Sequence, residues 1–530
     1  MNTVSYFIRG GDYDHAGAAT RNLKERLKRI GADPAGVRRA VIAAYEAETN
    51  VVIHATQGVM RARFDPQQIE IEVADEGPGI PDIGLAMKEG FSTAPPKARE
   101  LGFGAGLGLP NIRKNSDQFA IESVVGKGTK VHIVVYFSRS SYLAASQGTA
   151  IRVRGEFCRA CLRCVRRCPT GALRVRDTRP QILEHLCIGC GVCLSCCPTG
   201  ALVIAGETEL ARPQPGSVLV LPGAFLVQFG PQIDAPRVLA ALAALGFAEI
   251  LLAEYWLEGL RAAVRDFAEW EASTHPVIAP LCPAVVNLAE MRFPALLGNL
   301  APFLSPLEAA REELAGSAAG KAVFAIACPA QRTLLQTVGT DLANLNTIRH
   351  AIAPLLGSTP STQAHAIAAK QEAPATAGVL VASGIAHVMN TLEAAENNQL
   401  SDVRVLELFA CEGGCFGSSL LREDPLIARY RWSHILEIRQ GTPVKRGVRR
   451  QTPYTPRPGL RLDPDMTKAM EKLARIDEWT RRLPGRDCAC CGAPTCAACA
   501  EDIVLGRVGR NACLWLQSSA PQGEAPSEIK

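Results

Sequence analysis

CRACLRCVRRCPTGAL (residues 158–173) and CIGCGVCLSCCPTGAL (residues 187–202) form an internal repeat that decides the fold of this part of the chain. Each copy carries the run C-x2-C-x2-C-x3-C-P. Three thiolates at this spacing wrap one face of a [4Fe-4S] cube, and the fourth, before proline, reaches the other cube. The spacing predicts eight ligands: Cys158, Cys161, Cys164 and Cys197 for the first cluster, and Cys187, Cys190, Cys193 and Cys168 for the second.

The repeat resembles the two-cluster ferredoxins of bacteria over roughly 50 residues, which implies a ferredoxin-like module. A zinc site or unrelated cysteines are the alternatives, and the repetition of Pro-Thr-Gly-Ala-Leu after both runs argues against them. Cys196 fits neither set of ligands. Positive charge beside a cluster favours its reduced state, so the arginines of the first run are expected to raise its potential: Arg159, Arg163, Arg166 and Arg167.

The bulk composition narrows the class of protein. The 530 residues suggest three to five domains, and a net charge of +5 gives no sign of a nucleic-acid arm or a polybasic membrane patch. The longest apolar run, residues 238–256, is interrupted by Glu249 and Glu254, so we expect no membrane span. The N-terminal residues carry no export signal, so we expect a cytoplasmic location. Thiols stay reduced there, and the 19 cysteines therefore predict metal binding rather than disulfides.

The cysteines divide the chain into parts, because none precedes residue 158 and they fall at 158–197, at four separate positions, and at 488–513. The fold class expected is multidomain, combining α+β and α/β units. The predicted domains are 1–140, 150–206, 214–442 and 478–520. Linkers are predicted at 138–150, 206–217 and 442–459, with an insertion loop at 357–378.

The C-terminal segment CACCGAPTCAACAEDIVLGRVGRNAC (residues 488–513) holds Cys488, Cys491, Cys496 and Cys513 in the pattern C-x2-C-x4-C-x16-C. It resembles the small helical [4Fe-4S] domain of electron-transfer proteins such as the B subunit of the Rnf complex, in which a turn gives three ligands and a helix returns the fourth. Gly492 permits the tight turn. Cys490 and Cys499 do not fit the ligand spacing, and a structural zinc site is the alternative.

Four further cysteines follow strand-like apolar runs, in VIAPLCPAVV, AIACPAQR and LFACEGGCFGSS. Ligands collect at strand ends in open α/β sheets. The three loops resemble those of the catalytic domain of [FeFe] hydrogenases over residues 216–440, which implies an α/β fold with one cluster. By this resemblance the cluster ligands are Cys282, Cys328, Cys411 and Cys415, and Cys415 would bridge to a diiron centre. Buried structural cysteines are the alternative.

Three positions depart from the hydrogenase pattern. Leu281 stands where the family has a proton-carrying cysteine, and Gln331 stands where it has a lysine that binds the diiron centre. Phe409 replaces a methionine of the third loop. Loss of a proton relay typically costs 10²–10⁴-fold in rate. We therefore expect a cubane-only or catalytically slow domain used for electron transfer or sensing, with hydrogen turnover as the alternative.

The cysteine-free front contains four motifs in order. A helix carries Glu46 and Asn50 on one face, a strand runs into DEGPG (residues 75–79), a glycine-rich loop follows at 102–108, and two strand-like runs meet near Thr129. This order resembles the GHKL ATPases, closest to the anti-sigma-factor serine kinases, whose domain is an α/β sandwich. The resemblance implies ATP and Mg²⁺, with Asn50 as the metal ligand, Glu46 as the catalytic base and Asp75 as the adenine reader. Nucleotide contacts are expected also from Gly77, Gly79, Gly102, Gly104, Gly106, Gly108 and Thr129.

Together these parts predict a redox-responsive regulator, in which four [4Fe-4S] clusters are coupled to an ATP-binding kinase domain that acts on a protein partner. An electron-transferring oxidoreductase subunit with a redox partner is the alternative, and a scaffold stabilised by its clusters is a third. The kinase-like domain is expected to bind ATP, and the sequence leaves open whether it also catalyses an ATP-dependent reaction.

Overall fold

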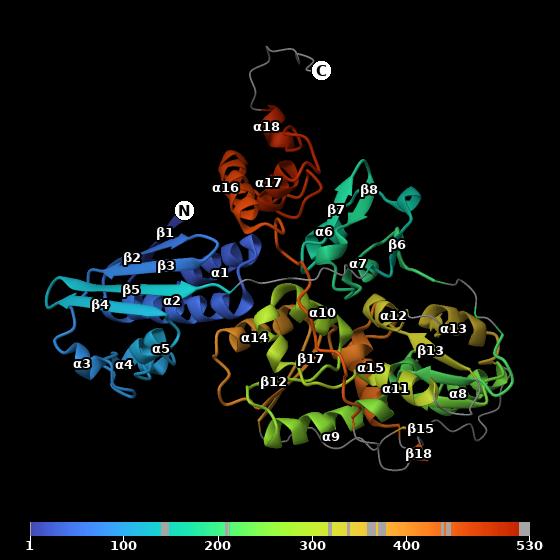
Figure 1. Ribbon diagram of the computed structural model, residues 1–530. Coiled ribbons are helices and arrows are strands. Elements are labelled where there is room, and N and C mark those ends of the chain that lie inside the picture. Colours follow the sequence, from blue (N-terminus) through green and yellow to red (C-terminus); the bar gives the residue numbers. More distant parts are fainter. Residues whose placement is uncertain are drawn as a thin grey trace.

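The computed structural model describes residues 2–138, 148–206, 210, 212–315, 321–336, 340–357, 367–368, 378–435, 439–440 and 447–518. Four predicted segments therefore lie wholly or partly outside the described residues: the linkers at 138–150, 206–217 and 442–459 and the insertion loop at 357–378. The fold is a multidomain mixture of helices and sheets, as the sequence predicted (Figure 1). Among the described residues, no helix has the length and apolar character needed to cross a membrane.

The N-terminal part is one antiparallel sheet covered on one face by helices (Figure 1). Its strands are β1 (Asn2–Arg9), β2 (Gln57–Phe64), β3 (Gln68–Asp75), β4 (Gln118–Val124) and β5 (Gly128–Tyr136), in the order β1-β2-β3-β5-β4. The covering helices are α1 (Ala18–Ile30) and α2 (Pro34–His54). Alternate residues of β2 and β3 are buried, which is the pattern of a sheet with one packed face.

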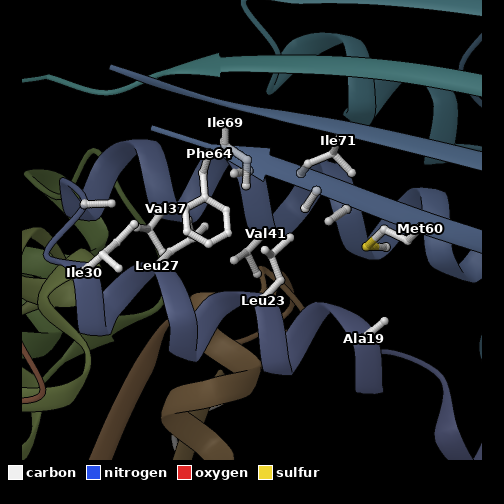
Figure 2. Close-up of a cluster of buried hydrophobic side chains, with 14 of the residues drawn as sticks. Ala19, Leu23, Leu27, Ile30, Val37, Val41, Met60, Phe64, Ile69 and Ile71 are labelled. Carbon is white, nitrogen blue, oxygen red and sulfur yellow. The ribbon is translucent and has the colours of Figure 1, made fainter. Parts of the chain in front are cut away.

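Figure 2 shows this core, where Leu23 and Leu27 of α1 and Val41 of α2 meet Met60 and Phe64 of β2. Gly31 ends α1 in the left-handed conformation, and the Asp33 carboxylate accepts from the Gly36 N–H to begin α2. Between β3 and β4 the chain forms three short helices, α3 (Ile83–Ala86), α4 (Pro96–Glu100) and α5 (Gly108–Lys114).

The cysteine repeat folds into two similar halves. The outer strands β6 (Ile151–Val153) and β9 (Leu202–Ile204) pair antiparallel, and β7 (Leu173–Arg176) pairs with β8 (Arg179–Ile182) as a hairpin. Each half also has a short helix that contains its third cysteine, α6 (Arg163–Arg167) and α7 (Val192–Ser195).

The long α/β segment contains two parallel sheets. The larger has the order β14-β13-β10-β11-β15-β18 and the smaller the order β12-β17-β16. The strands are β10 (Val218–Leu221), β11 (Glu249–Leu252), β12 (Val277–Ile278), β13 (Ala322–Ile326), β14 (Asp341–Asn344), β15 (Ile367–Ala368), β16 (Val379–Ser383), β17 (Val405–Phe409) and β18 (Arg439–Gln440). The helices are α8 (Ala235–Ala244), α9 (Glu254–Trp270), α10 (Pro283–Arg292), α11 (Pro306–Ala315), α12 (Pro329–Leu335), α13 (Leu345–Ile352), α14 (Ile385–Glu396) and α15 (Pro425–Ser433).

The C-terminal part consists of α16 (Met466–Arg482), α17 (Cys496–Val504) and α18 (Leu514–Ser518). Its core is continuous with that of the N-terminal part, because Leu473 and Ile476 of α16 belong to the same buried cluster as Leu23 and Leu27 of α1. An ion pair between Arg26 and Asp477 lies beside this contact. The two ends of the chain therefore meet in one hydrophobic core.

Candidate iron–sulfur and nucleotide sites

The two halves of the cysteine repeat bring their thiols close together. The Cys164 thiol lies within electrostatic range of Cys158 and Cys197, and the Cys193 thiol lies within range of Cys187, Cys190 and Cys168. Cys196, which the spacing assigned to neither cluster, lies within range of both Cys164 and Cys193 and also of the predicted ligand Cys161. Burial raises the pKa of Cys164 to about 12, so ionising these thiols needs a compensating positive charge such as iron.

The backbone of each run turns around its site through left-handed residues. Gly189 and Gly191 hold this conformation in the second run, whereas Ala160 and Leu162, at the equivalent positions, hold it in the first, with φ of 49° and 60°. Backbone N–H groups then point at sulfur: Ala160 N lies 3.4 Å from Cys158 Sγ and Ala172 N lies 3.3 Å from Cys168 Sγ. Such hydrogen bonds are among the features that set cluster potentials.

The four separated cysteines of the α/β segment converge on one cavity of about 30 Å³. Cys282 precedes α10 and Cys328 precedes α12, while Cys411 and Cys415 follow β17. Cys415 has a large exposed fraction although protein surrounds it, because its side chain faces this cavity. Burial raises the pKa of the Cys328 thiol to about 12. Four thiols that line one cavity suit a multi-iron cluster.

Leu281, Gln331 and Phe409 line the same cavity. The Gln331 Oε1 accepts from the N–H of Ala327, the residue before Cys328, at 2.8 Å. Leu281 is buried and carries no exchangeable proton. The cavity walls therefore offer a nonpolar side chain and a hydrogen-bonded amide at two of the three positions where the sequence departs from the hydrogenase pattern.

The second half of the repeat lies directly against this cavity. Cys190 is one of the lining residues, and the Ala330 N–H donates to the Gly189 carbonyl at 3.0 Å. The Asn287 amide also donates to the Ile188 carbonyl at 3.2 Å. The two ligand loops are thus bonded to each other through the backbone.

The tail brings together more thiols than the sequence predicted. One cavity is lined by six cysteines: Cys488, Cys490, Cys491, Cys496, Cys499 and Cys513. Cys499 lies one helical turn after Cys496 and is 1% exposed. A hydrogen bond from the Cys499 thiol lowers the pKa of Cys491 to about 6. The sequence analysis left Cys499 out, although its i,i+3 spacing from Cys496 in a helix could have indicated that both thiols lie on one face.

The tail loop is docked on the β7–β8 hairpin. A Cβ on Gly492 would stand 1.8 Å from the Val175 carbonyl oxygen, so the residue is needed for close approach as well as for its φ of +76°. The Val175 N–H donates to the Gly492 carbonyl at 3.0 Å. Asp502, which is fully buried, accepts from Arg174 Nε at 2.5 Å and from Arg176 Nη2 at 2.6 Å.

Zinc and cluster binding differ in how closely thiols must converge. A zinc ion needs its ligands at about 2.3 Å from one point. In the described part of the chain, no group of three His, Cys, Asp or Glu side chains converges closely enough for a single ion. In the tail and in the α/β segment, the cysteines line one cavity each. All 19 cysteines are free thiols.

The nucleotide motifs gather at one end of the N-terminal sheet. Asn50 and Glu46 face α5, since a Cβ on Gly108 would lie 3.3 Å from Asn50 Oδ1 and 3.5 Å from Glu46 Oε2. Asn111 Nδ2 donates to Glu46 Oε1 at 2.8 Å, a contact that the sequence motifs did not indicate. Burial raises the pKa of Glu46, and the Asn111 hydrogen bond opposes this shift.

Asp75 is held by backbone groups on both sides. Its Oδ1 accepts from the Gly77 N–H at 2.8 Å and from the Thr129 N–H at 3.1 Å. The second carboxylate oxygen remains for another donor, as adenine recognition requires. Gly79 packs against the Val124 carbonyl, where a Cβ would stand 2.4 Å from the oxygen.

The glycine-rich loop folds against the segment before α4. Gly104 and Gly106 have positive φ and pack on Ala94 and Gly90, respectively, at distances that exclude a Cβ. Gly102 also has positive φ but has open space around it. Two of the four predicted lid glycines therefore have a packing role, and Gly108 begins α5 beside Asn50.

Comparisons with known proteins found three family models that match separate parts of the chain. Residues 11–135 match the model described as histidine kinase-like ATPase domain, residues 217–333 match iron only hydrogenase large subunit, C-terminal domain, and residues 483–514 match putative Fe-S cluster. The serine/threonine-protein kinase RsbT of Bacillus subtilis is 32% identical over 121 residues, which are 22% of this chain and 85% of that protein.

The anti-sigma F factor of Caldanaerobacter subterraneus is 37% identical over 100 residues, so the chain spans 66% of its length. Among solved structures, the [FeFe]-hydrogenase HydA1 from Chlamydomonas reinhardtii aligns with a TM-score of 0.34 and 11% identity, over 44% of this chain and 88% of that one. The comparisons confirm the predicted combination of a kinase-like domain, an Fe-S cluster domain and a hydrogenase-type domain.

Proposed function

The first domain of this chain belongs to the histidine kinase-like ATPase family, and on that premise we propose that the protein is a redox-responsive regulator. In this proposal, iron–sulfur clusters bias an ATP-binding kinase domain that acts on a protein partner. When bound, a [4Fe-4S] cluster takes up or releases one electron. The ligands are the sixteen cysteines that the sequence assigned, in four sets. The cysteine-lined cavities of the α/β segment and the tail, and the proximity of the thiols within the repeat, support the assignment.

The observation that carries the proposal is the position of α14. Its N-terminus rests on the Cys411 loop, where the Gly384 N–H donates to the carbonyls of Phe409 at 3.0 Å and Cys411 at 3.2 Å. At its other end, Glu396 pairs with Lys24 at 2.5 Å and Lys28 at 2.9 Å, both on α1 of the kinase-like domain. One helix of 12 residues, about 18 Å long, therefore joins the cavity of the four thiols to α1.

The contact at the far end is a buried ion pair. Burial opposes ionisation of Glu396, but the two lysines more than offset this and lower its pKa. Its side chain is 2% exposed, so separating the groups would leave uncompensated charges in a nonpolar interface. The pair thus holds α14 and α1 in one position, and a displacement of α14 is passed to the kinase-like domain.

A second contact leads toward the nucleotide motifs. Gln399, just beyond α14, donates to the Tyr45 hydroxyl at 3.2 Å, and Tyr45 precedes Glu46 on α2. The N-terminal end of α14 carries partial positive charge near the Cys411 loop. An added negative charge there attracts this end of the helix, and the pull is transmitted along the helix to Glu396 and Gln399.

The proposed roles at the nucleotide site are those that the resemblance to the GHKL ATPases implies, and the proximity of Glu46 and Asn50 to Gly108 supports them. Asn50 binds Mg²⁺ through its side-chain oxygen, and Asp75 accepts from the adenine amino group. Glu46, held by Asn111, accepts the proton of a partner's hydroxyl group. The glycine loop and α5 cover the phosphates with backbone N–H groups.

The test is nucleotide affinity in two redox states. Anaerobic protein with its clusters assembled is titrated with a fluorescent ATP analogue, first oxidised and then reduced with dithionite. We expect different dissociation constants in the two states for the parent chain and equal constants for Glu396→Gln, which loses the anionic link. Arg61→Gln, at an exposed pair with Glu72, is the matched control and keeps the difference. Equal affinity in both states for the parent chain rejects the coupling.

An electron-transferring oxidoreductase subunit is the second candidate function. It is favoured by the contacts that bring the ligand sites into a continuous series, from the tail loop through the β7–β8 hairpin to the Gly189–Ala330 bond. Viologen-linked hydrogen assays after maturation test it. Sustained hydrogen turnover, despite Leu281 and Gln331 at the cavity, would make this the primary function.

A further inference from the structure

The cysteine repeat carries an uneven share of the charge of this protein. Residues 148–206 contain nine arginines, no lysine and three acidic residues, a net charge of +6, whereas the whole chain has +5. The remainder of the chain is therefore close to neutral. Two bound clusters with their thiolates would bring about −2 each, which still leaves this module positive.

The charge is concentrated beside the first set of cysteines. Arg159, Arg163 and Arg167 are exposed, and Arg163 and Arg167 lie on one face of α6 because they are four residues apart. We call these three residues the arginine face. Within the described residues, none of the three forms an ion pair with a carboxylate. Arg166, by contrast, turns to the tail and donates to the Cys488 carbonyl at 2.9 Å.

Other arginines of the same module differ from the arginine face, because they bind partners within the protein. Arg174 and Arg176 hold Asp502, and Arg154 donates to the Gly200 carbonyl and stacks on Phe157 with 4.6 Å between the guanidinium carbon and the ring centre. These side chains have structural partners. Among the residues that the structure describes, the arginine face has no such partner, so its charge is available to a molecule outside the chain.

The arginine face flanks the most accessible ligand of the repeat in the chain. Cys161 is exposed and lies between Arg159 and Arg163 in the sequence, and Phe157, two residues before Arg159, is 46% exposed. The second set of cysteines faces inward, against Ala330 and Asn287 of the hydrogenase-type segment. Of the two cluster sites in this repeat, only the first is therefore close enough to the surface to exchange electrons with an external carrier.

We propose that the arginine face is the docking surface for a small acidic iron–sulfur electron carrier, which delivers electrons at the site of Cys158, Cys161, Cys164 and Cys197. The exchange moves one electron: the reduced carrier is oxidised by one electron, the site gains it, and no atom or proton is transferred. Opposite charge brings the two surfaces together quickly and orients them. The proposal rests on cluster binding at the repeat but not on a regulatory role for ATP.

A nucleic acid is the other polyanion that a basic surface attracts. The observations favour a protein carrier, because three arginines around one exposed cysteine loop make a compact patch, without the long basic stripe that follows a phosphate backbone. A redox site beside these arginines can exchange electrons with an electron carrier, whereas a nucleic acid carries no electrons to exchange.

The test uses the full chain with its clusters assembled and a strongly acidic bacterial 2[4Fe-4S] ferredoxin as the probe. Binding is measured by calorimetry at 25 mM and 200 mM salt, and electron transfer from the dithionite-reduced probe is followed by stopped flow. We expect Arg159→Gln, Arg163→Gln and Arg167→Gln together to weaken binding roughly tenfold at low salt and little at high salt, because screening removes the contribution of exposed charges. The second-order rate of electron transfer should fall in parallel.

Two further variants keep the result interpretable. The combination Arg63→Gln, Arg429→Gln and Arg475→Gln removes three exposed arginines elsewhere and should leave binding unchanged. The Lys replacements of the arginine face should retain binding, and iron and sulfide content must match in all variants. Equal affinity of parent and triple Gln variant, no binding of the probe by the parent, or tighter binding of a 20-nucleotide single-stranded DNA at the arginine face would each overturn the proposal. Redox-independent ATP affinity would leave it standing, so the two proposals fail separately.

Discussion

The buried carboxylate of Asp502 ties the tail to the cysteine repeat, and its replacement by asparagine tests how firmly. Asp502 is fully buried and receives Arg174 at 2.5 Å, Arg176 at 2.6 Å and Arg507 at 3.1 Å. Removing one partner of a buried ion pair costs about 3–5 kcal/mol. Two contacts soften the loss: Arg174 still donates to the Gly171 carbonyl at 2.7 Å, and Arg507 keeps Glu501 at 3.3 Å. We expect Asp502→Asn to destabilise the docked tail by about 3 kcal/mol.

Hydrogen exchange of the amides in α17 measures this cost directly. A loss of about 3 kcal/mol in the opening free energy lowers protection roughly 100-fold. Asp477→Asn, at an ion pair whose partners are 20% and 34% exposed, is the control and should change protection less than about fivefold. If Asp502→Asn changed the protection of α17 no more than this control, the tail would be held by packing alone and the electrostatic account would be refuted.

Three further outcomes are expected. Gly492→Ala should release the tail loop from β7, because its Cβ would stand 1.8 Å from the Val175 carbonyl oxygen; faster proteolysis near residue 487 would report this, and unchanged cleavage would contradict it. Burial raises the pKa of Glu290 to about 7 from 4.5, so the folded chain holds the extra proton and its free energy of unfolding should fall by up to roughly 3 kcal/mol as pH rises through this window. Urea unfolding of Glu290→Gln should lack that slope. In the tail, Cys499→Ala should keep the iron content while Cys496→Ala loses about four irons per chain, and equal loss would make Cys499 a ligand.

Sites whose residues lie close together in the chain were easier to predict from the sequence than sites whose residues lie far apart. The ligand sets of the repeat could be assigned from spacing, since both runs are short and duplicated. Cys282, Cys328, Cys411 and Cys415 span more than a hundred residues, and only the resemblance of their loops to a known family suggested that they meet; the structure places them around one cavity.

Contacts between segments far apart in the chain could not be predicted from the sequence. Lys24 and Lys28 are ordinary residues of an amphipathic helix, and nothing in their pattern indicates Glu396, more than 360 positions away. The hydrogen bond from Asn111 to Glu46 likewise joins two helices whose relative position depends on the folded glycine loop. The helix α16 was not anticipated, because its apolar positions serve the N-terminal core and not the cysteine domain that follows.

The shared core of α1 and α16 has a consequence for the order of folding. Leu23 and Leu27 are synthesised early, but Leu473 and Ile476, which complete their cluster, leave the ribosome only after the cysteine-bearing segments. Domains usually fold as units in the order of synthesis. Here the ATP-binding part acquires its full covering last, so a chain that stops short of residue 466 would expose apolar surface on α1. The complete N-terminal core therefore requires that synthesis has passed α16, which ends at Arg482.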